Sequence, residues 1–272
     1  MTDLADREWR LIREESWDGP TNMALDEVAA ETAAAGGPRT LRVYRWEPST
    51  LSLGYHQDPE TIDWGYAERE GITVTRRPTG GGGIYHDSEG DISYSIVAPA
   101  AELPSKLIDS YHLLCEPVLR GFSRMGVDAR FAQEPQPEIH HPACYLRELH
   151  PAHDVVAGTE GRKVSGNAQY RQRDAVIQHG SLTYEVRTEP HLAVFRDHEV
   201  EPEAFEGRVT GIHEESGVSR DGAVAALESA LSEWAEAEDG SWSDTELERA
   251  REIARGKYAD DRWTRERVDP TG

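Results

Sequence analysis

Residues 76–87, with the sequence RRPTGGGGIYHD, decide how the rest of this chain is interpreted, because four consecutive glycines directly follow a basic turn. Glycines without a Cβ let a backbone approach a ligand and aim several amide N–H groups at it, as anion-binding nests do. Arg76 and Arg77 add positive charge suited to a phosphate or a carboxylate. No Gly-Lys-Ser/Thr follows, so the stretch is not a P-loop. A glycine-rich hairpin turn with two surface arginines, which has no binding function, would explain the same residues equally well.

A second segment, residues 160–169 (EGRKVSGNAQ), places Lys163 among small residues, and residues 178–182 (QHGSL) follow it. Lysine is scarce, since Lys106 and Lys257 are the only others. A lysine on a strand beside glycines can polarise an acyl carbonyl and neutralise a neighbouring phosphate. A solvated hairpin lysine is the plainer alternative, and we expect Lys163 to be an exposed strand residue that contributes little packing.

The amino-acid composition indicates the environment of the protein and excludes some partners, but it does not identify an activity. The 272 residues carry 51 Asp and Glu against 29 Lys and Arg, a net charge of −22. Such a field repels phosphate backbones, so we expect no nucleic-acid partner. The acidic, lysine-poor surface suggests adaptation to salt. Without a long apolar run or a signal peptide, and with only two cysteines, the sequence predicts a cytoplasmic protein with no membrane partner.

The hydrophobic pattern predicts an α+β fold around a mixed β-sheet flanked by helices. Pro117 should kink or divide the helix predicted over 105–125. A turn at 238–240 should separate two C-terminal helices, at 224–235 and 245–258. We predict a catalytic domain over residues 1–200 and a helical subdomain over 201–272 that packs on it. The other predicted helices cover 22–35 and 63–70, and the predicted strands cover 40–46, 51–55, 72–76, 91–97, 154–157, 162–164 and 175–186.

Together the motifs at 76–87 and 160–169 resemble the lipoate–protein ligase A and octanoyltransferase family. The resemblance extends to residues 22–27 (NMALDE), 48–55 (PSTLSLGY) and 257–263 (KYADDRW), so it covers nearly the whole chain. It implies a catalytic domain related to that of biotin protein ligase.

The resemblance also implies roles for named residues. Lys163 would hold the activated carbonyl, and an acyl tunnel would take its walls from Leu51, Leu53, Val74 and Ile84. The acceptor would be a lysine on a lipoyl domain of a 2-oxoacid dehydrogenase or on the glycine cleavage H protein. The residues expected to bind the acyl group or its adenylate are Arg76, Arg77, Thr79, Gly80, Gly81, Gly82, Gly83, Ile84, Tyr85, His86, Gly166, Ala168, His179 and Gly180.

Two chemistries compete within this family. A ligase would activate lipoate with ATP and Mg²⁺ to lipoyl-AMP, and Asp154 would help to hold the metal, although His153 stands where ligases tend to place asparagine. Many ligases carry an accessory domain after this core, which a ligase of this length would take from a separate subunit. We rank the ligase first, because the glycine loop is uninterrupted and is followed by His86 and Asp87.

The rival is an octanoyltransferase that needs neither ATP nor metal. It would accept an octanoyl group from a donor as a thioester on Cys144, which is catalytic only in this case. Because thiolate is the attacking form, Cys144 would need a nearby positive charge such as Lys163. An inert, buried Cys144 is the plainer alternative. A non-catalytic subunit that binds lipoyl domains is a third hypothesis, from another class, and Lys163 with the whole glycine loop speaks against it.

Overall fold

Two β-sheets organise the protein, whose computed structural model describes residues 7–151, 153–172 and 174–270. The larger sheet is mixed and has the strand order β11-β1-β2-β6-β10-β9-β8-β7, while the smaller has the order β4-β3-β5. The strands of the larger sheet are β1 (Trp9–Trp17), β2 (Arg39–Trp46), β6 (Asp91–Pro99), β7 (Ala129–Phe131), β8 (Asp154–Ala157), β9 (Arg162–Arg171), β10 (Ala175–Thr183) and β11 (Glu238–Asp239). Those of the smaller sheet are β3 (Thr50–Leu53), β4 (Thr73–Arg76) and β5 (Ile84–His86).

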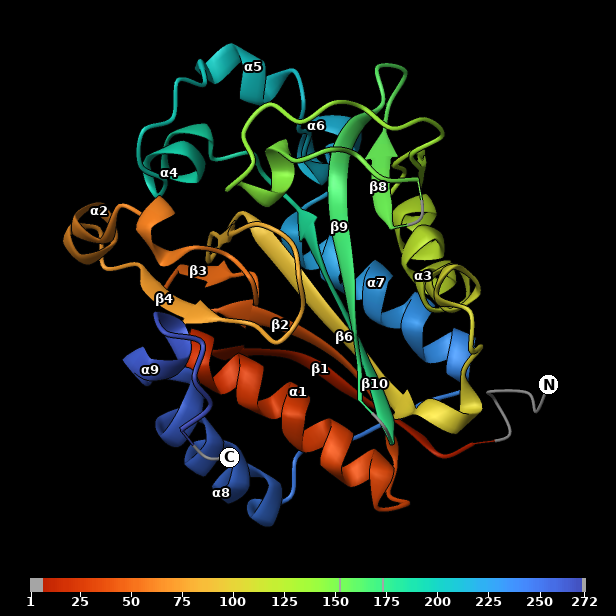
Figure 1. The fold of residues 1–272 in the computed structure, drawn as a ribbon. Helices are drawn as coiled ribbons and strands as arrows, with labels where there is room; N and C mark the ends of the chain where they lie inside the picture. The colour runs from red at the N-terminus through yellow and green to blue at the C-terminus, as the bar shows by residue number, and fades with distance from the viewer. Residues whose placement is uncertain (1–6, 152, 173, 271–272) are drawn as a thin grey trace.

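Helices cover both faces of the larger sheet, as the alternation of side chains along β2 requires. Leu41 and Val43 point to the face covered by α3 (Leu107–Arg124) and α7 (Arg220–Ala235). Tyr44 and Trp46 point to the opposite face, where α1 and α8 pack against each other (Figure 1). The bounds of that second layer are α1 (Gly19–Ala34), α8 (Asp244–Ile253) and the π-helical turn Ala254–Tyr258.

The N-terminus of α1 is fixed over the sheet by two polar side chains. Asp18 caps the helix by accepting a hydrogen bond from the Thr21 amide at 2.8 Å. The amide of Asn22 donates to the main-chain carbonyls of Trp17 and Arg45, both at 3.0 Å. These bonds join α1 to β1 and β2, so the first turn of the helix lies beside the strand that carries Tyr44.

A third cluster of buried residues lies between the smaller sheet and a group of short helices. Leu51, Leu53 and Phe195 belong to this cluster, which fixes the strands on either side of the glycine loop. These helices are α2 (Trp64–Arg69), α4 (Thr188–Ala193) and α5 (Pro202–Glu206). Of the other short helices, α6 (Ile212–Ser216) packs on the side of α3 and α7 through Ile212, and α9 (Asp261–Thr264) packs on the side of α1 and α8 through Trp263. Short 3₁₀ turns occur at Pro59–Thr61, Ala100–Glu102 and Cys144–Leu146.

The α+β class and most of the expected elements are confirmed, and three local features differ from the prediction or were missed by it. Helix α3 is not divided at Pro117, because Leu114 and Val118 anchor the helix to the core on either side of the lost hydrogen bond. The expected turn at 238–240 begins with β11, which pairs in parallel with β1. Strand β1 itself was not predicted, since charged residues interrupt its apolar pattern and its register shifts between Ile12 and Glu15.

The segment after residue 200 contributes to several layers. Helix α7 packs on one face of the larger sheet, α8 lies on the other, and β11 extends the sheet edge. Within the described residues, no helix combines the length and apolar character that crossing a membrane requires.

Candidate active site

A cavity of about 490 Å³ lies over the larger sheet and runs across its strands. Five neighbouring strands line it, and one lining residue of each strand belongs to a row that is paired in register. With strands spaced about 4.8 Å apart, the row is about 19 Å long. Its inner members are small, which leaves a groove above the sheet. The row consists of Asp154, Gly166, Ser181, Ser93 and Tyr44.

One end of the cavity is largely apolar. Met23 from α1, Tyr44 and Trp46 from β2, and Ile84 from β5 line this end. The Trp46 ring stacks on the His86 ring with centroids 4.1 Å apart, and its Nε1 donates to the Ser93 hydroxyl at 2.9 Å. The indole is therefore held on two sides, and this wall of the cavity is rigid.

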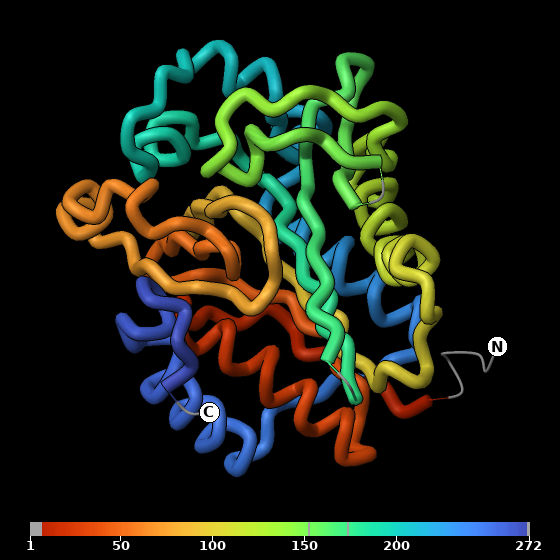
Figure 2. Tube along the Cα trace, viewed as in Figure 1, coloured from red at the N-terminus to blue at the C-terminus, as the bar shows by residue number. Residues whose placement is uncertain are grey.

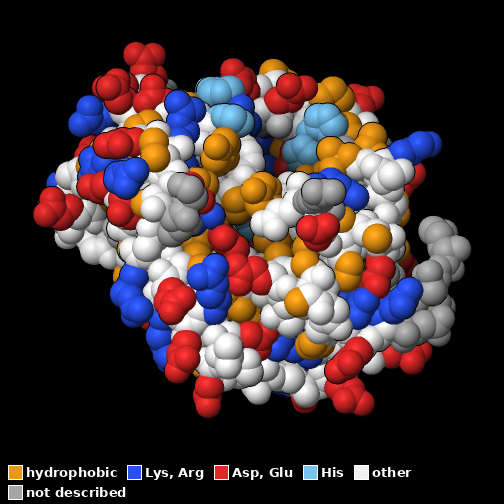
Figure 3. Space-filling model, turned by 60° about the horizontal axis from the view of Figure 1, so that its bottom comes forward, with side chains coloured by type: hydrophobic (Ala, Val, Ile, Leu, Met, Phe, Trp, Pro, Cys, Tyr) orange, Lys and Arg blue, Asp and Glu red, His pale blue; other side chains and the backbone are white. Residues whose placement is uncertain are grey.

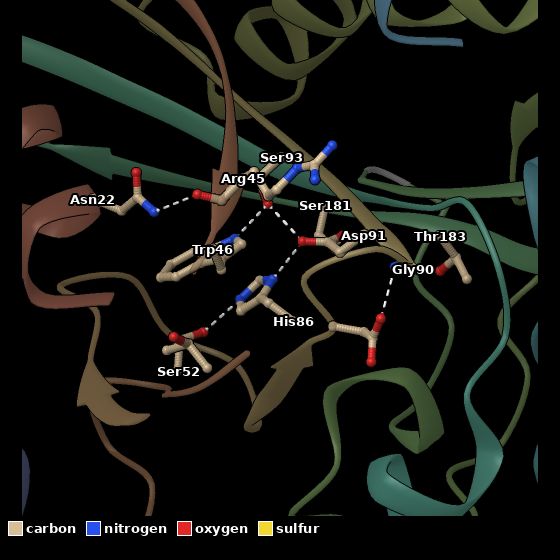
Figure 4. Close-up of polar contacts among 12 residues, drawn as sticks. Asn22, Arg45, Trp46, Ser52, His86, Gly90, Asp91, Ser93, Ser181 and Thr183 are labelled. Atoms are coloured by element: carbon tan, nitrogen blue, oxygen red, sulfur yellow. Dashed lines mark hydrogen bonds and ion pairs between the residues drawn. The ribbon is translucent and has the colours of Figure 1, made fainter. Parts of the chain in front are cut away.

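His86 connects the smaller sheet to the larger one (Figure 4). Its Nδ1 lies 2.8 Å from an Asp91 carboxylate oxygen on β6, and its Nε2 lies 2.9 Å from the Ser52 hydroxyl on β3. Burial lowers the pKa of His86, although Asp91 opposes the shift. Asp91 also accepts hydrogen bonds from Ser93 and Ser181. This network fixes the sheet that carries the glycine loop relative to the sheet that carries Lys163.

Lys163 reaches the cavity because of a β-bulge. Ser165 pairs with Val155 and Lys163 pairs with Val156, so β9 has one extra residue, Val164, against β8. Val164 points into the core, which leaves Lys163 on the same face as Gly166. Bulges commonly redirect a side chain beside a functional site. The expectation of an exposed lysine is wrong, because Lys163 is only 2 % exposed.

The ammonium group of Lys163 is held as an ion pair. Its Nζ lies 2.7 Å from an Asp154 carboxylate oxygen, and the other Asp154 oxygen accepts the His150 amide at 2.8 Å. Burial lowers the pKa of Lys163, but the Asp154 carboxylate more than offsets this, so the pKa lies above its ordinary value. For Asp154 the two effects have the opposite signs. Burial raises the pKa of this carboxyl, but the positive charge of Lys163 and the contact with His153 outweigh burial and bring the pKa well below its usual range. Lys163 is therefore a fixed cation at neutral pH.

Cys144 lies next to this lysine, on a loop that crosses over β9 in Figure 2. The Lys163 Nζ donates to the main-chain carbonyl of Cys144 at 3.3 Å. The thiol is free and partly exposed, and Cys144 lines the cavity. The other cysteine, Cys115, is fully buried in α3, where burial raises its pKa to about 12.

The glycine loop and the Cys144 loop are joined by main-chain hydrogen bonds. The Gly83 amide donates to the Pro142 carbonyl at 2.7 Å, and the Cys144 amide donates to the Gly83 carbonyl at 2.9 Å. Gly82 allows this approach, since a Cβ there would lie 2.6 Å from the Pro142 carbonyl oxygen. The structure therefore brings the two sequence motifs and Cys144 together.

Arg77 shapes the glycine loop from inside. Its guanidinium donates to the carbonyls of Gly80 and Gly82 at 2.7 Å each and to the Ser52 carbonyl at 2.7 Å. Its Nε donates to the Thr79 hydroxyl, which also contacts His179 Nε2 at 2.8 Å. Most of the N–H groups of Arg77 are therefore already hydrogen-bonded within the protein.

The candidate residues divide into two groups. Arg76, Thr79, Gly82, Gly83 and Tyr85 do not line the cavity. The Arg76 side chain is buried and donates to main-chain carbonyls, including that of Gly54 at 2.6 Å, while Tyr85 packs in the third cluster. The candidates that line the cavity are Arg77, Gly80, Gly81, Ile84, His86, Cys144, Asp154, Lys163, Gly166, Ala168, His179 and Gly180.

The expected tunnel walls are largely wrong. Leu51 and Leu53 are fully buried, and both pack with Val74 in the core of the smaller sheet, so only Ile84 of the four faces the cavity. The apolar residues that do line the cavity were missed. Tyr44 and Trp46 alternate with buried Leu41 and Val43 on β2, and this alternation is the signal that could have assigned them to a separate face.

The charged end of the cavity opens between side chains of mixed polarity. Arg147, Glu138, His141, His150 and His153 line it. Figure 3 shows a hollow on this face with histidine side chains beside it. Among the residues that the structure describes, no group of three or more His, Cys, Asp or Glu side chains is placed to hold a metal ion.

An apolar groove that ends at a buried lysine and a partly exposed cysteine suits a molecule with an apolar tail and a reactive carbonyl. These features define an acyl-transferring class of enzyme. Comparison with known proteins gives the family. Residues 18–234 match the family model of the lipoyl protein ligase A/B catalytic domain.

The chain is similar over its length to the octanoyltransferase LipM of Kyrpidia tusciae, with 34 % identity over 94 % of this chain and 97 % of that one. It is 30 % identical to the octanoyltransferase LipM of Bacillus subtilis, over 95 % and 98 % of the two chains. The structure of a lipoate-protein ligase A bound with ATP superposes with a TM-score of 0.79 at 26 % identity, covering 96 % of this chain and all of that one. A bi-partite lipoate protein ligase from Thermoplasma acidophilum shares the fold, with a TM-score of 0.80 at 24 % identity over 96 % and 98 % of the two chains.

The chain therefore belongs to the lipoyl protein ligase A/B catalytic-domain family. It is an enzyme that attaches lipoyl or octanoyl groups.

Proposed function

We propose that the protein is an octanoyltransferase that carries the acyl group as a thioester on Cys144 and transfers it to a lysine of a lipoyl domain. One observation carries the proposal: the Cys144 loop and Lys163 meet at the charged end of an apolar cavity, with Nζ 3.3 Å from the Cys144 carbonyl. The similarity to octanoyltransferases over nearly the whole chain supports it. We place the protein in the cytoplasm, where its cysteines stay reduced.

In the first half-reaction, the Cys144 thiolate attacks the carbonyl carbon of an octanoyl thioester on a carrier protein. The bond between that carbon and the carrier sulfur breaks, the carrier leaves as a thiol after taking up a proton, and the acyl group remains on Cys144. Thioester exchange of this kind needs no ATP and no metal.

In the second half-reaction, the neutral amine of an acceptor lysine attacks the carbonyl carbon of the Cys144 thioester. An amide forms, the bond from carbon to sulfur breaks, Cys144 leaves as a thiolate, and the new amide nitrogen gives up a proton. The acceptor belongs to a lipoyl domain of a 2-oxoacid dehydrogenase or to the glycine cleavage H protein.

Lys163 stabilises the negative charge that develops on the carbonyl oxygen in both steps. Asp154 keeps the amine protonated and fixes its direction, so the cation requires little reorganisation when charge develops. Because the pair lies in a largely buried site, its electrostatic effect exceeds that of an exposed lysine.

A ligase is the second candidate, and the similarity to a lipoate-protein ligase A bound with ATP favours it. It would need ATP and Mg²⁺ near Lys163, where Asp154 is the expected metal ligand. Both Asp154 oxygens already accept hydrogen bonds, from Lys163 and from the His150 amide. The carboxylate therefore suits a lysine-positioning role better than a metal-binding one. This reverses the order in which the sequence alone ranked the two activities.

The test compares two reactions by mass spectrometry. Purified protein receives an octanoyl carrier protein and apo lipoyl domain without ATP, and separately octanoate or lipoate with ATP, Mg²⁺ and the same acceptor. We expect octanoylation of the acceptor in the first mixture, and an octanoyl adduct on Cys144 when the acceptor is omitted. Modification only in the mixture with ATP would replace the transferase by the ligase.

A matched pair of variants isolates the thiol. Cys144→Ser should abolish both the adduct and the transfer, because a serine hydroxyl stays protonated where a thiol ionises. Cys115→Ser should keep both, since the Cys115 sulfur is buried and accepts a hydrogen bond from Gln178, which a serine oxygen can also accept.

A further inference from the structure

Arg208 belongs to the segment between α5 and α6 and is outside every motif discussed above. Its side chain is buried, and its guanidinium donates to two main-chain carbonyls, those of Pro137 at 2.7 Å and Arg147 at 3.2 Å. These carbonyls lie on either side of Cys144 in the chain. One guanidinium thus joins the two arms of the loop that carries the cysteine.

The main chain of the same segment holds Lys163. The Lys163 amide donates to the Arg208 carbonyl at 2.8 Å, and the Thr210 amide donates to the Lys163 carbonyl at 3.0 Å. This connection lies at the bulge in β9, where regular pairing with β8 is interrupted. Arg208 therefore contacts Lys163 through its backbone and the Cys144 loop through its side chain.

The burial of this cation requires an explanation. Among the described residues, no carboxylate lies within ion-pair distance of the Arg208 guanidinium. Burial lowers its pKa, and the Asp154 carboxylate opposes the shift from a distance. An apolar side chain of similar length would avoid the cost of desolvating a charge, but it could not hold two carbonyl groups.

We propose that Arg208 is the positioning residue that fixes Cys144 relative to Lys163, an inference that rests on the proposed function. Two rigid connections through one residue keep the thiol and the ammonium group at a constant separation. A displacement of about 1 Å between reacting groups can reduce a rate about 100-fold. The Cys144 loop also remains attached to the glycine loop through Gly83, so removing the guanidinium loosens the loop without releasing it.

The experiment compares Arg208→Met, Arg208→Lys and a control, Arg171→Met. Arg171 lies on β9 as Lys163 does, and its guanidinium also donates to a main-chain carbonyl, that of Pro104 at 2.9 Å, but it does not line the cavity. Rapid-quench mass spectrometry measures the octanoylation of Cys144, and iodoacetamide alkylation of Cys144 is followed across pH. Thermal unfolding of each variant accompanies both measurements.

For Arg208→Met we expect acylation to slow by roughly 10- to 100-fold with KM within about twofold of wild type, because positioning acts on the reacting state. The alkylation rate of Cys144 should also differ from that of wild type at each pH, because the two carbonyl contacts that hold its loop are lost. Arg208→Lys should recover part of the rate and keep the alkylation profile. Arg171→Met should match wild type in both.

Acylation of Arg208→Met at the wild-type rate would overturn the proposal, as would equal losses in Arg208→Met and Arg171→Met that follow their melting temperatures. Failure of wild-type protein to form the Cys144 adduct would instead count against the proposed function. The alkylation profiles would still test Arg208 in that case, because they need no acyl donor.

Discussion

Lys163 and Lys257 are both buried lysines paired with a carboxylate, yet they belong to regions with opposite properties. Lys163 is paired with Asp154 and faces a cavity beside Cys144. Lys257 lies 2.9 Å from Glu27 and 3.2 Å from Asp269, and its ammonium group is 4.8 Å from the centroid of the Trp263 ring. The Trp263 ring packs against Lys257 and closes that site. The site of Lys163 opens into the cavity and is accessible to a substrate.

An ion pair alone does not make a functional site. In both regions a carboxylate keeps the pKa of the lysine above its ordinary value against the effect of burial. What distinguishes Lys163 is the free volume in front of it and a nucleophile within reach. Lys257 instead fastens the C-terminal segment to α1. The following variants test this difference, beginning with the largest expected effect.

Lys163→Ala should have the largest effect, lowering Cys144 acylation and acceptor modification by roughly 10²- to 10³-fold, because an oxyanion-stabilising cation is lost. Single-turnover mass spectrometry of adduct and product measures it. Lys257→Ala is the control and should stay within a few-fold of wild type at temperatures where it is folded. Full acylation by Lys163→Ala would remove this lysine from the mechanism.

The same two variants should also differ in stability. Lys163→Ala leaves Asp154 buried without its partner, so the free energy of unfolding should fall by about 3–5 kcal/mol. Lys257→Ala should cost less, about 1–2 kcal/mol, because the Glu27 side chain is 22 % exposed and can rehydrate. Urea titrations give both values. The double variant Lys163→Met/Asp154→Asn should recover part of the first loss, and no recovery would mean that the charge imbalance is not the cause.

Gly82→Ala should lower the acylation rate by roughly 10-fold, because its new Cβ would lie 2.9 Å from the Cys144 amide nitrogen and displace that loop. Gly80→Ala is the matched substitution in the same turn, where a Cβ meets no atom within 4 Å. The alkylation rate of Cys144 reports on the displacement. Equal alkylation rates in the two variants would show that the close contact at Gly82 does not position the cysteine.

The smallest expected effect is on the pH dependence of stability. Since the folded pKa of Asp154 is depressed, the stability it contributes is present above its unfolded pKa of about 3.9 and is lost progressively as the pH falls below that value. Since the folded pKa of Lys163 is raised, its contribution is present below about pH 10 and is lost at higher pH. Asp154→Asn should therefore flatten the acid limb of stability against pH, as urea unfolding at several pH values can measure. An unchanged acid limb would contradict the assignment.

The sequence predicted the class of fold and the central motifs, because glycine loops and a rare lysine are local signals. It could not predict β1, whose charged residues pair with partners more than 200 positions away, such as Arg10 with Glu246. Nor could it reveal that Arg76 serves the scaffold while the adjacent Arg77 reaches the cavity. In the sequence the two arginines cannot be distinguished. In the structure Arg76 is the last residue of β4 and Arg77 begins the loop that follows it, so their side chains have different surroundings.

The lining of the cavity was the least predictable part. A row that crosses five strands joins residues whose numbers run from 44 to 181, and only the register of the sheet shows that they are neighbours. Arg208 was missed for a related reason, because its importance lies in two carbonyl contacts to a distant loop and not in any motif. Contacts made by the main chain leave almost no trace in a single sequence.

The bulge in β9 makes the register of that strand as important as its composition. Side chains alternate along a strand, so regular pairing of the same residues with β8 would place Val164 over the cavity and turn the ammonium group of residue 163 into an apolar interior. A slip of one position in this pairing, with no change of amino acid, would therefore silence the enzyme.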